Sequence, residues 1–402
     1  MSDIQQFNLN KIFIAIPLIV IFFANIFITQ LRGLSFIGEI AMIAGVTSLI
    51  AILIGHRSDI AILSNSENRA LLNLAESIKG IALIILFLIP FLFFLYFLGI
   101  KIEYLLIAIL SCVFAINDSV SSFYIRNGNF YFYSFFKSMP SLILLISAYF
   151  INSPEMSWII SYLISLIILS FLTFNLLKDS NLKFNFFSIA NYLITKIVPT
   201  ITALICATGT VFWLFIITSK TGSESAGIWS NVYRIFSLPL IFLTATYLPL
   251  VLLKLGDLKK TTKKINHMNK FSIIYISLSC AIVFFAFIAG PEIFIKFTGS
   301  DVRLSVSLLI TMIMFAIFKN FLGYHQSFFQ TLQLDFVLLI ILILEIIAAG
   351  IIYFWIEANE LQIIVNYIFS ITGICAFILL IFLIGLSVKY YLFNPNDSIE
   401  LK

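Results

Sequence analysis

Long apolar runs separated by short polar segments dominate the sequence. A helix that crosses the ~30 Å hydrocarbon core of a bilayer needs about 20 predominantly apolar residues. Twelve runs of roughly this length are present, and we expect each to form a membrane-spanning helix. Their ranges are 11–30, 34–54, 80–99, 104–124, 138–153, 157–177, 195–218, 226–253, 271–290, 302–324, 336–356 and 362–388.

Two of these runs differ from the others. The fifth is the shortest, and the eighth is long and contains Pro239 and Pro249. Because proline removes a helical hydrogen bond, we expect a kink in the eighth helix. The polar links 56–79 and 254–270 are predicted to be helical segments on the inner surface.

The composition agrees with this pattern. The chain has 402 residues, of which 61% are hydrophobic and 11% are charged, whereas soluble domains carry roughly 25% charged residues. The fold class is therefore an all-α polytopic membrane protein. The N-terminal sequence MSDIQQFNLNK leads into the first apolar run without a small-residue cleavage site, so we expect the first helix to remain in the mature protein.

The distribution of lysine and arginine predicts the orientation. Seventeen of these residues lie on the same side as the N-terminus, five lie on the opposite side, and Arg234 and Lys319 fall within predicted helices. Because cytoplasmic loops carry the excess of positive charge, both termini are predicted to be cytoplasmic. No predicted outer segment exceeds about a dozen residues, which leaves no room there for a catalytic domain.

Sequence motifs of enzymes and of metal or nucleic-acid sites are absent. The chain contains no HExxH, GxSxG or GxxxxGK[ST] motif and no DxD-like cluster. Its cysteines are isolated in apolar runs, its histidines are scattered, and no basic run alternates with aromatics. We therefore predict a protein that is not an enzyme, holds no metal and does not bind nucleic acid.

The chain contains an internal repeat. A shift of 189 residues places the first, second and third predicted helices on the seventh, eighth and ninth. Identical pairs in the second and eighth helices include Gly38 and Gly227, Ser48 and Ser237, and Leu49 and Leu238. Repeats of this kind are common in transporters, whose substrate site lies between the two halves. We predict two six-helix units, 1–185 and 190–402, with a solute path between them.

A polar stripe follows the eighth predicted helix. Its members recur at spacings of three, four and seven residues, and they are Ser230, Asn231, Arg234, Ser237 and Thr244. Counted from Ala226, Arg234 lies roughly 12 Å along the helix, near the midplane. An arginine at this depth costs about 2.5–3.5 kcal/mol on insertion scales. Two interpretations remain open: Arg234 contacts the substrate, or it pairs with a buried carboxylate.

Two further cations are candidates for the solute path. Arg32, in QLRGLSFIGE, lies at the outer end of the first two helices and either anchors the interface or contacts the path. Lys319, in AIFKNFLGY, lies near the inner end of the tenth helix, from which its side chain can also extend to the interface.

Three acids are embedded in predicted helices. Glu39 lies in the outer third of the second helix, Asp118 lies in a serine-rich stripe of the fourth, and Glu345 lies near the midplane of the eleventh. An acid in hydrocarbon is usually paired or protonated. Each acid is therefore a candidate for coupling transport to a proton or sodium gradient, or for pairing with a buried cation.

Four segments resemble the family of bacterial flippases that translocate polysaccharide repeat units. They are RGLSFIGEIAMIAGVTSLIAILIGHRSDIAIL (32–63), IRNGNFYFYSFFKSMPSLILL (125–145), SAGIWSNVYRIFSLPLIFLTATYLPL (225–250) and PEIFIKFTGSDVRLSVSLL (291–309). The turn after Arg32 departs from the family pattern, because it lacks the leucine–glycine pair that usually follows the arginine.

The resemblance implies the fold of the multidrug/oligosaccharidyl-lipid/polysaccharide (MOP) exporter superfamily, in which two six-helix lobes form a V around a central cavity. It also implies a function: movement of an undecaprenyl-pyrophosphate-linked O-antigen or capsule unit across the bacterial inner membrane, from the cytoplasmic to the periplasmic leaflet. The sugar-pyrophosphate would occupy the cavity while the prenyl chain stays among membrane lipids. Implied partners are the polymerase and chain-length proteins of the same pathway. No cofactor is implied beyond an ion gradient.

The physical chemistry of the implied substrate is consistent with the polar stripe. A pyrophosphate cannot cross hydrocarbon unaided, because its charges would lose their hydration. Arginine presents a fork of donors suited to phosphate oxygens. Two alternatives remain: a polysaccharide polymerase, for which a large outer loop is expected, and a cation-coupled drug exporter on the same fold, for which an acid-dominated cavity is expected.

Overall fold

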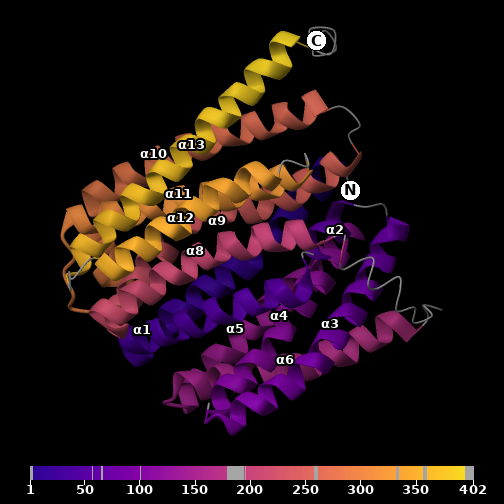
Figure 1. Cartoon of the computed structure of the whole chain (residues 1–402), viewed down its shortest axis with the longest axis horizontal. Helices are drawn as coiled ribbons and strands as arrows, with labels where there is room; N and C mark the ends of the chain where they lie inside the picture. Colours follow the sequence, from indigo (N-terminus) through magenta and orange to yellow (C-terminus); the bar gives the residue numbers. More distant parts are fainter. Residues whose placement is uncertain are drawn as a thin grey trace.

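The computed structural model describes residues 3–56, 58–64, 67–99, 101–178, 194, 196–257, 261–331, 335–355 and 360–393, and the regular elements in these ranges are helices. Figure 1 shows them side by side in an elongated bundle. The helices are α1 (Asp3–Gly55), α2 (Ser58–Ser64), α3 (Glu67–Phe97), α4 (Ile102–Arg126), α5 (Phe130–Phe150), α6 (Pro154–Lys178), α8 (Ile197–Thr221), α9 (Ser223–Asp257), α10 (Thr261–Thr298), α11 (Val306–Thr331), α12 (Asp335–Trp355) and α13 (Leu361–Phe393).

Eleven of the described helices contain a segment long and apolar enough to cross a membrane. The segment in α1, Phe13–Gly55, has 43 residues and would extend for about 65 Å if straight, roughly twice the hydrocarbon thickness. Gly33, with φ 87° and ψ 175°, interrupts its helical geometry. This residue lies between the first two predicted helices.

Contacts with α5 show that α1 turns back at Gly33. The carbonyl of Phe13 accepts a hydrogen bond from Ser134, near the start of α5. Arg32 instead binds the carbonyl of Tyr149, at the far end of α5. After the turn, the chain returns to the first side, where Ser58 contacts Ser119 in the second half of α4. When α1 is counted as two crossings, the described helices provide the twelve predicted crossings in the predicted order.

Several helix boundaries differ from the prediction. The third predicted helix starts at residue 80, but α3 starts at Glu67, and the fifth starts at residue 138, but α5 starts at Phe130. The apolar-run criterion ends a helix at polar residues, whereas the backbone hydrogen bonds continue through them. The predicted helical link 56–79 therefore corresponds to α2 and the first turns of α3. In the eighth predicted helix, α9 remains helical through Pro239 and Pro249.

Two clusters of buried apolar side chains organise the bundle. One is formed by residues between Ile28 and Leu169. The other is formed mainly by residues between Cys206 and Leu383, together with residues of both halves of α1, such as Phe22 and Ala41, and a few residues of α2, α4 and α5. Figure 1 shows α1 between the two groups of helices. The predicted boundary between the two units, residues 185–190, lies outside the described residues.

Two glycines allow α1 and α9 to approach closely. A Cβ atom at Gly38 would overlap the carbonyl oxygen of Ser223, and a Cβ atom at Gly227 would overlap the carbonyl oxygen of Leu34. The contact is reciprocal, because Leu34 and Ser223 are separated by the same 189 residues as Gly38 and Gly227. A two-fold relation between the second and eighth predicted helices would produce such a contact. Small residues serve this purpose where membrane helices cross.

Candidate functional site

Arg234 lies where α9 packs against α1, and we call this contact between the two halves of the chain the seam. It is half-buried on α9, and its Nη1 atom donates a 2.8 Å hydrogen bond to Oδ1 of Asn25 on α1. Asn25 is held in turn by its own helix, because its Nδ2 donates to the carbonyl of Ile21 at 2.6 Å. The arginine of the polar stripe therefore faces the first half of α1.

One turn away from Arg234, Asn231 makes a second contact across the seam. Oγ1 of Thr29 lies 3.3 Å from Oδ1 of Asn231 and also donates to the carbonyl of Asn25 at 2.8 Å. Nδ2 of Asn231 donates to the carbonyl of Gly227 at 3.1 Å. Two predicted stripe residues, Arg234 and Asn231, thus join α9 to α1.

The remaining stripe residues have local roles. Ser237 is buried and donates to the carbonyl of Tyr233 in its own helix, and Thr244 donates to the carbonyl of Ile241. Ser230 is buried beside Asn231.

No described acid neutralises Arg234. Within the part of the chain that the structure describes, the ion pairs closer than 4.0 Å are Lys137–Asp118 and Lys319–Glu345, and Arg234 takes part in neither. Its described partner is the neutral amide of Asn25. The first of the two interpretations of Arg234, contact with an anionic substrate, is therefore the one that its described surroundings favour.

Lys319 and Glu345 form an ion pair inside the second cluster. Nζ of Lys319 on α11 lies 2.7 Å from Oε2 of Glu345 on α12, and the two residues are 4% and 1% exposed. Oε1 of Glu345 accepts from Nε1 of Trp213 at 3.3 Å and from Oγ1 of Thr372 at 3.2 Å. Lys319 is therefore directed toward Glu345 and not toward the interface. Lys319 and Glu345 were separate candidates in the sequence, and in the structure they form one ion pair.

Asp118 also has a cationic partner. It pairs with Lys137 across α4 and α5, and both side chains remain partly exposed. In the predicted repeat, α4 and α5 correspond to α11 and α12. The polarity is reversed between the two pairs: the acid lies on the first helix in Asp118–Lys137 and on the second in Lys319–Glu345.

Arg32 binds the end of α5. Its Nε donates to the carbonyl of Ala148 at 2.7 Å, its Nη2 to the carbonyl of Tyr149 at 2.8 Å, and its Nη1 to Oδ1 of Asn152. These carbonyls belong to the last turn of α5, which has no helical donors of its own and carries the negative end of the helix dipole. Its described contacts thus tie the α1 turn to α5.

Replacing Arg32 with alanine is expected to lower the free energy of unfolding by about 1.5–3 kcal/mol, because carbonyls at the α5 terminus lose a charged donor. Thermal unfolding of the purified protein in detergent would measure this. Arg303→Ala, an exposed arginine beyond the end of α10, serves as the control and should leave the transition unchanged. Equal transitions for Arg32→Ala and the wild type would contradict this role.

Glu39 differs from the other two acids. It is half-buried, and among the described residues no lysine or arginine nitrogen lies within 4.0 Å of it.

The partners of Arg234 and Asn231 were not predicted from the sequence. Asn25 and Thr29 are separated by four residues, so they share one face of an otherwise apolar helix. This four-residue spacing of polar side chains could have marked Asn25 and Thr29 as candidates. Trp213 and Thr372, which bind Glu345, carry no comparable signal, because single polar atoms are frequent in membrane helices.

The fold is that of an all-helical polytopic membrane protein whose first helix forms a hairpin. No protein-family model matches the chain, and no curated protein matches it in sequence. Solved structures with this fold include MATE-family transporters of the MOP superfamily, the superfamily whose fold was expected from the sequence.

Three comparisons illustrate the likeness. An inward-facing multidrug-resistance MATE transporter is 14% identical, with a TM-score of 0.63, covering 97% of this chain and 96% of its own. A MOP superfamily transporter from Pyrococcus furiosus is also 14% identical, with a TM-score of 0.66 and 96% coverage of both chains. A MATE protein in complex with MaD3S is 14% identical, with a TM-score of 0.64, covering 97% of this chain and 99% of its own. At this identity the likeness concerns the fold.

Proposed function

We propose that this protein is a flippase for an undecaprenyl-pyrophosphate-linked oligosaccharide, an O-antigen or capsule unit, which it moves from the cytoplasmic to the periplasmic leaflet. The observation that carries the proposal is Arg234: a half-buried cation in the seam between the two halves of the bundle, whose described partner is a neutral amide. A positive charge in this position, without an acidic partner among the described residues, favours an anionic substrate.

Asn25 and a bound pyrophosphate would compete for Arg234, and this competition would couple substrate binding to the packing of α9 against α1. A hydrogen bond between a guanidinium and a phosphate oxygen is charge-assisted at both ends and stronger than one to an amide oxygen. A pyrophosphate that reaches Arg234 would therefore displace Asn25 and remove one contact between α9 and α1. Binding would loosen the seam, as alternating access requires.

Two further observations support the proposal. The four sequence segments described above resemble the polysaccharide-unit flippases, and two of them include Arg32 and Arg234. The fold is shared with transporters of the MOP superfamily, to which the multidrug MATE proteins belong. A large outer loop, which the polymerase alternative would need, has no counterpart among the described connections.

A cation-coupled drug exporter is the second candidate. The solved structures of similar fold include multidrug-resistance transporters, and Glu39 is a half-buried acid without a described cationic partner. In this candidate Glu39 would bind a proton or a sodium ion. Efflux of a cationic dye by cells that express the chain, abolished by Glu39→Gln and unaffected by Arg234→Ala, would favour the exporter over the flippase.

Loss of the charge at Arg234 is expected to abolish surface polysaccharide. The test is complementation of a strain that lacks its own copy of this gene, with protein level measured in parallel. Arg234→Ala should give no surface polysaccharide at a normal protein level. The control is Lys220→Ala, which removes an equal charge from a lysine whose Nζ lies 5.4 Å from the ring of Tyr353 on α12. Normal polysaccharide from Arg234→Ala would contradict the proposal.

A further inference from the structure

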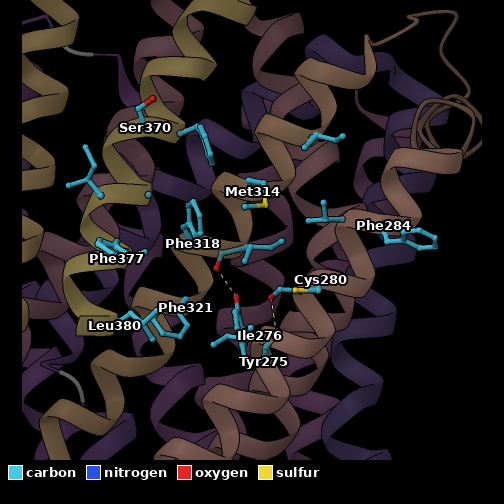
Figure 2. Close-up of a pocket in the computed structure, with 18 of the residues that line it drawn as sticks. Tyr275, Ile276, Cys280, Phe284, Met314, Phe318, Phe321, Ser370, Phe377 and Leu380 are labelled. Carbon is cyan, nitrogen blue, oxygen red and sulfur yellow. Dashed lines mark hydrogen bonds between the residues drawn. The ribbon is translucent and has the colours of Figure 1, made fainter. Parts of the chain in front are cut away.

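A long apolar groove lies on the second half of the bundle, between α10, α11 and α13. Its volume is about 1050 Å³. Figure 2 shows Met314 and Phe318 of α11 between the flanking residues of α10 and α13, such as Cys280 and Phe377. The α10 wall extends from Tyr275 to Phe287, about 18 Å along the helix axis. The groove lies around the middle of the three membrane-crossing segments and is long enough for a single acyl chain, which spans about 15 Å, half of the hydrocarbon core.

The walls of the groove offer nothing to a polar ligand. No charged residue lines it. Its hydroxyl groups donate to backbone carbonyls: Tyr275 to Ile317 at 2.8 Å, Ser279 to Tyr275 at 2.8 Å, and Ser370 to Asn366 at 2.9 Å. A water molecule in the groove would find few of the two to four polar partners that buried water needs. The occupant is therefore a hydrocarbon chain and not a headgroup or water.

The groove is continuous with the lipid-facing surface of three membrane-crossing helices. Its rim residues Phe284 and Phe377 are each 62% exposed, and in a membrane this exposure is to hydrocarbon. Beneath them on α11, Met314 and Phe318 are only half-buried. Phe315 and Ala316 of the same helix are fully buried. A space left empty here would deprive these side chains of contact partners.

We infer that this groove binds one acyl chain of a membrane phospholipid. The chain would contact protein on three sides, along α10, α11 and α13, whereas a boundary lipid contacts only the outer surface. Because no cation lines the groove, nothing in it selects a pyrophosphate-bearing lipid over the phospholipids that surround the protein. The inference concerns a site separate from Arg234 and does not depend on the proposed function.

Photocrosslinking to the groove floor tests the inference. The protein is reconstituted with a phosphatidylcholine that carries a diazirine within one acyl chain, irradiated, digested and mapped by mass spectrometry. Crosslinks are expected on Met314 and Phe318, which lipid can reach only through the groove. Phosphatidylcholine with a diazirine on its headgroup should not label these residues.

Matched variants on α13 separate groove binding from general lipid contact. Gly373 lies on the groove wall, and a Cβ atom there would lie 3.1 Å from the Phe318 ring, so Gly373→Phe places a ring in the groove. Gly385→Phe adds the same ring on the same helix where no atom lies within 4 Å of the added Cβ. Gly373→Phe should reduce labelling of Met314 several-fold, and Gly385→Phe should not. Ser370→Phe, at an exposed groove residue, should act as Gly373→Phe does if the latter fails to fold.

Two results would overturn the inference. One is labelling of Met314 and Phe318 no stronger than that of Phe315 on the buried face of the same helix. The other is suppression of their labelling by a small excess of undecaprenyl phosphate but not by an equal excess of unlabelled phosphatidylcholine, which would assign the groove to a prenyl chain.

Discussion

Replacing Lys319 with methionine is expected to lower the free energy of unfolding by about 3–5 kcal/mol, because Glu345 would be left as a buried charge without its cationic partner. The pair is nearly inaccessible, with exposures of 4% and 1%, so solvent cannot replace the missing cation. Space is also limited, since a Cβ atom on the adjacent Gly209 would lie only 2.7 Å from the lysine nitrogen. The thermal transition of the purified protein, followed by size-exclusion chromatography after heating, measures the loss.

The double variant Lys319→Met/Glu345→Leu distinguishes charge pairing from packing. Removal of both charges leaves only neutral donors on Trp213 and Thr372 without an acceptor, so the double variant should recover most of the lost stability. Lys296→Met serves as a control, because Lys296 is exposed near the end of α10 and an exposed charge contributes little. A single variant as stable as the wild type would show that the buried pair does not form.

Replacing Gly227 with alanine is expected to separate α1 from α9, because the added Cβ would overlap the backbone carbonyl of Leu34, and a backbone atom cannot move aside as a flexible side chain can. Overpacking of this kind costs about 1–3 kcal/mol or more. The separation can be measured with cysteines at Ser35 and Ser223, whose Oγ atoms lie 2.7 Å apart. Oxidation should form a disulfide in the otherwise unchanged protein and much less of it in the Gly227→Ala background.

Gly350 provides the matched control for that experiment. It lies within α12, and no atom lies within 4 Å of a Cβ added there. Gly350→Ala should leave the Ser35–Ser223 crosslink intact and stabilise the helix by roughly 0.5–1 kcal/mol. Equal crosslinking in the Gly227→Ala and Gly350→Ala proteins would contradict the close crossing of α1 and α9.

The sequence predicted the crossings well, since a run of about 20 apolar residues has few alternatives to a membrane helix. Gly33 falls in the predicted break between the first two helices because glycine tolerates the positive φ of that turn. The helix ends were less predictable. In α3 and α5 the helix extends into polar residues at its start, which a hydropathy criterion excludes.

The pairing of polar residues could not be predicted. Lys319 and Glu345 lie on different helices, and Arg234 and Asn25 are 209 residues apart. In soluble proteins the apolar face of a helix indicates its direction of packing, but a membrane helix is apolar on both its protein and its lipid sides. The sequence therefore located the embedded charges without revealing which of them meet. Only the structure shows that Arg234 binds an amide across the α1–α9 contact, that Lys319 pairs with an acid, and that Arg32 binds the end of α5.

We propose that Arg234 binds the pyrophosphate of a prenyl-linked substrate, and binding by the purified protein is a direct measure of this contact. Undecaprenyl pyrophosphate is titrated into wild-type, Arg234→Gln and Lys220→Gln proteins in detergent, and the dissociation constants are compared. A charge-assisted hydrogen bond contributes about 1.5–3 kcal/mol, so Arg234→Gln should weaken binding by roughly 10- to 150-fold, while Lys220→Gln leaves it unchanged. An unchanged dissociation constant for Arg234→Gln would contradict the claim.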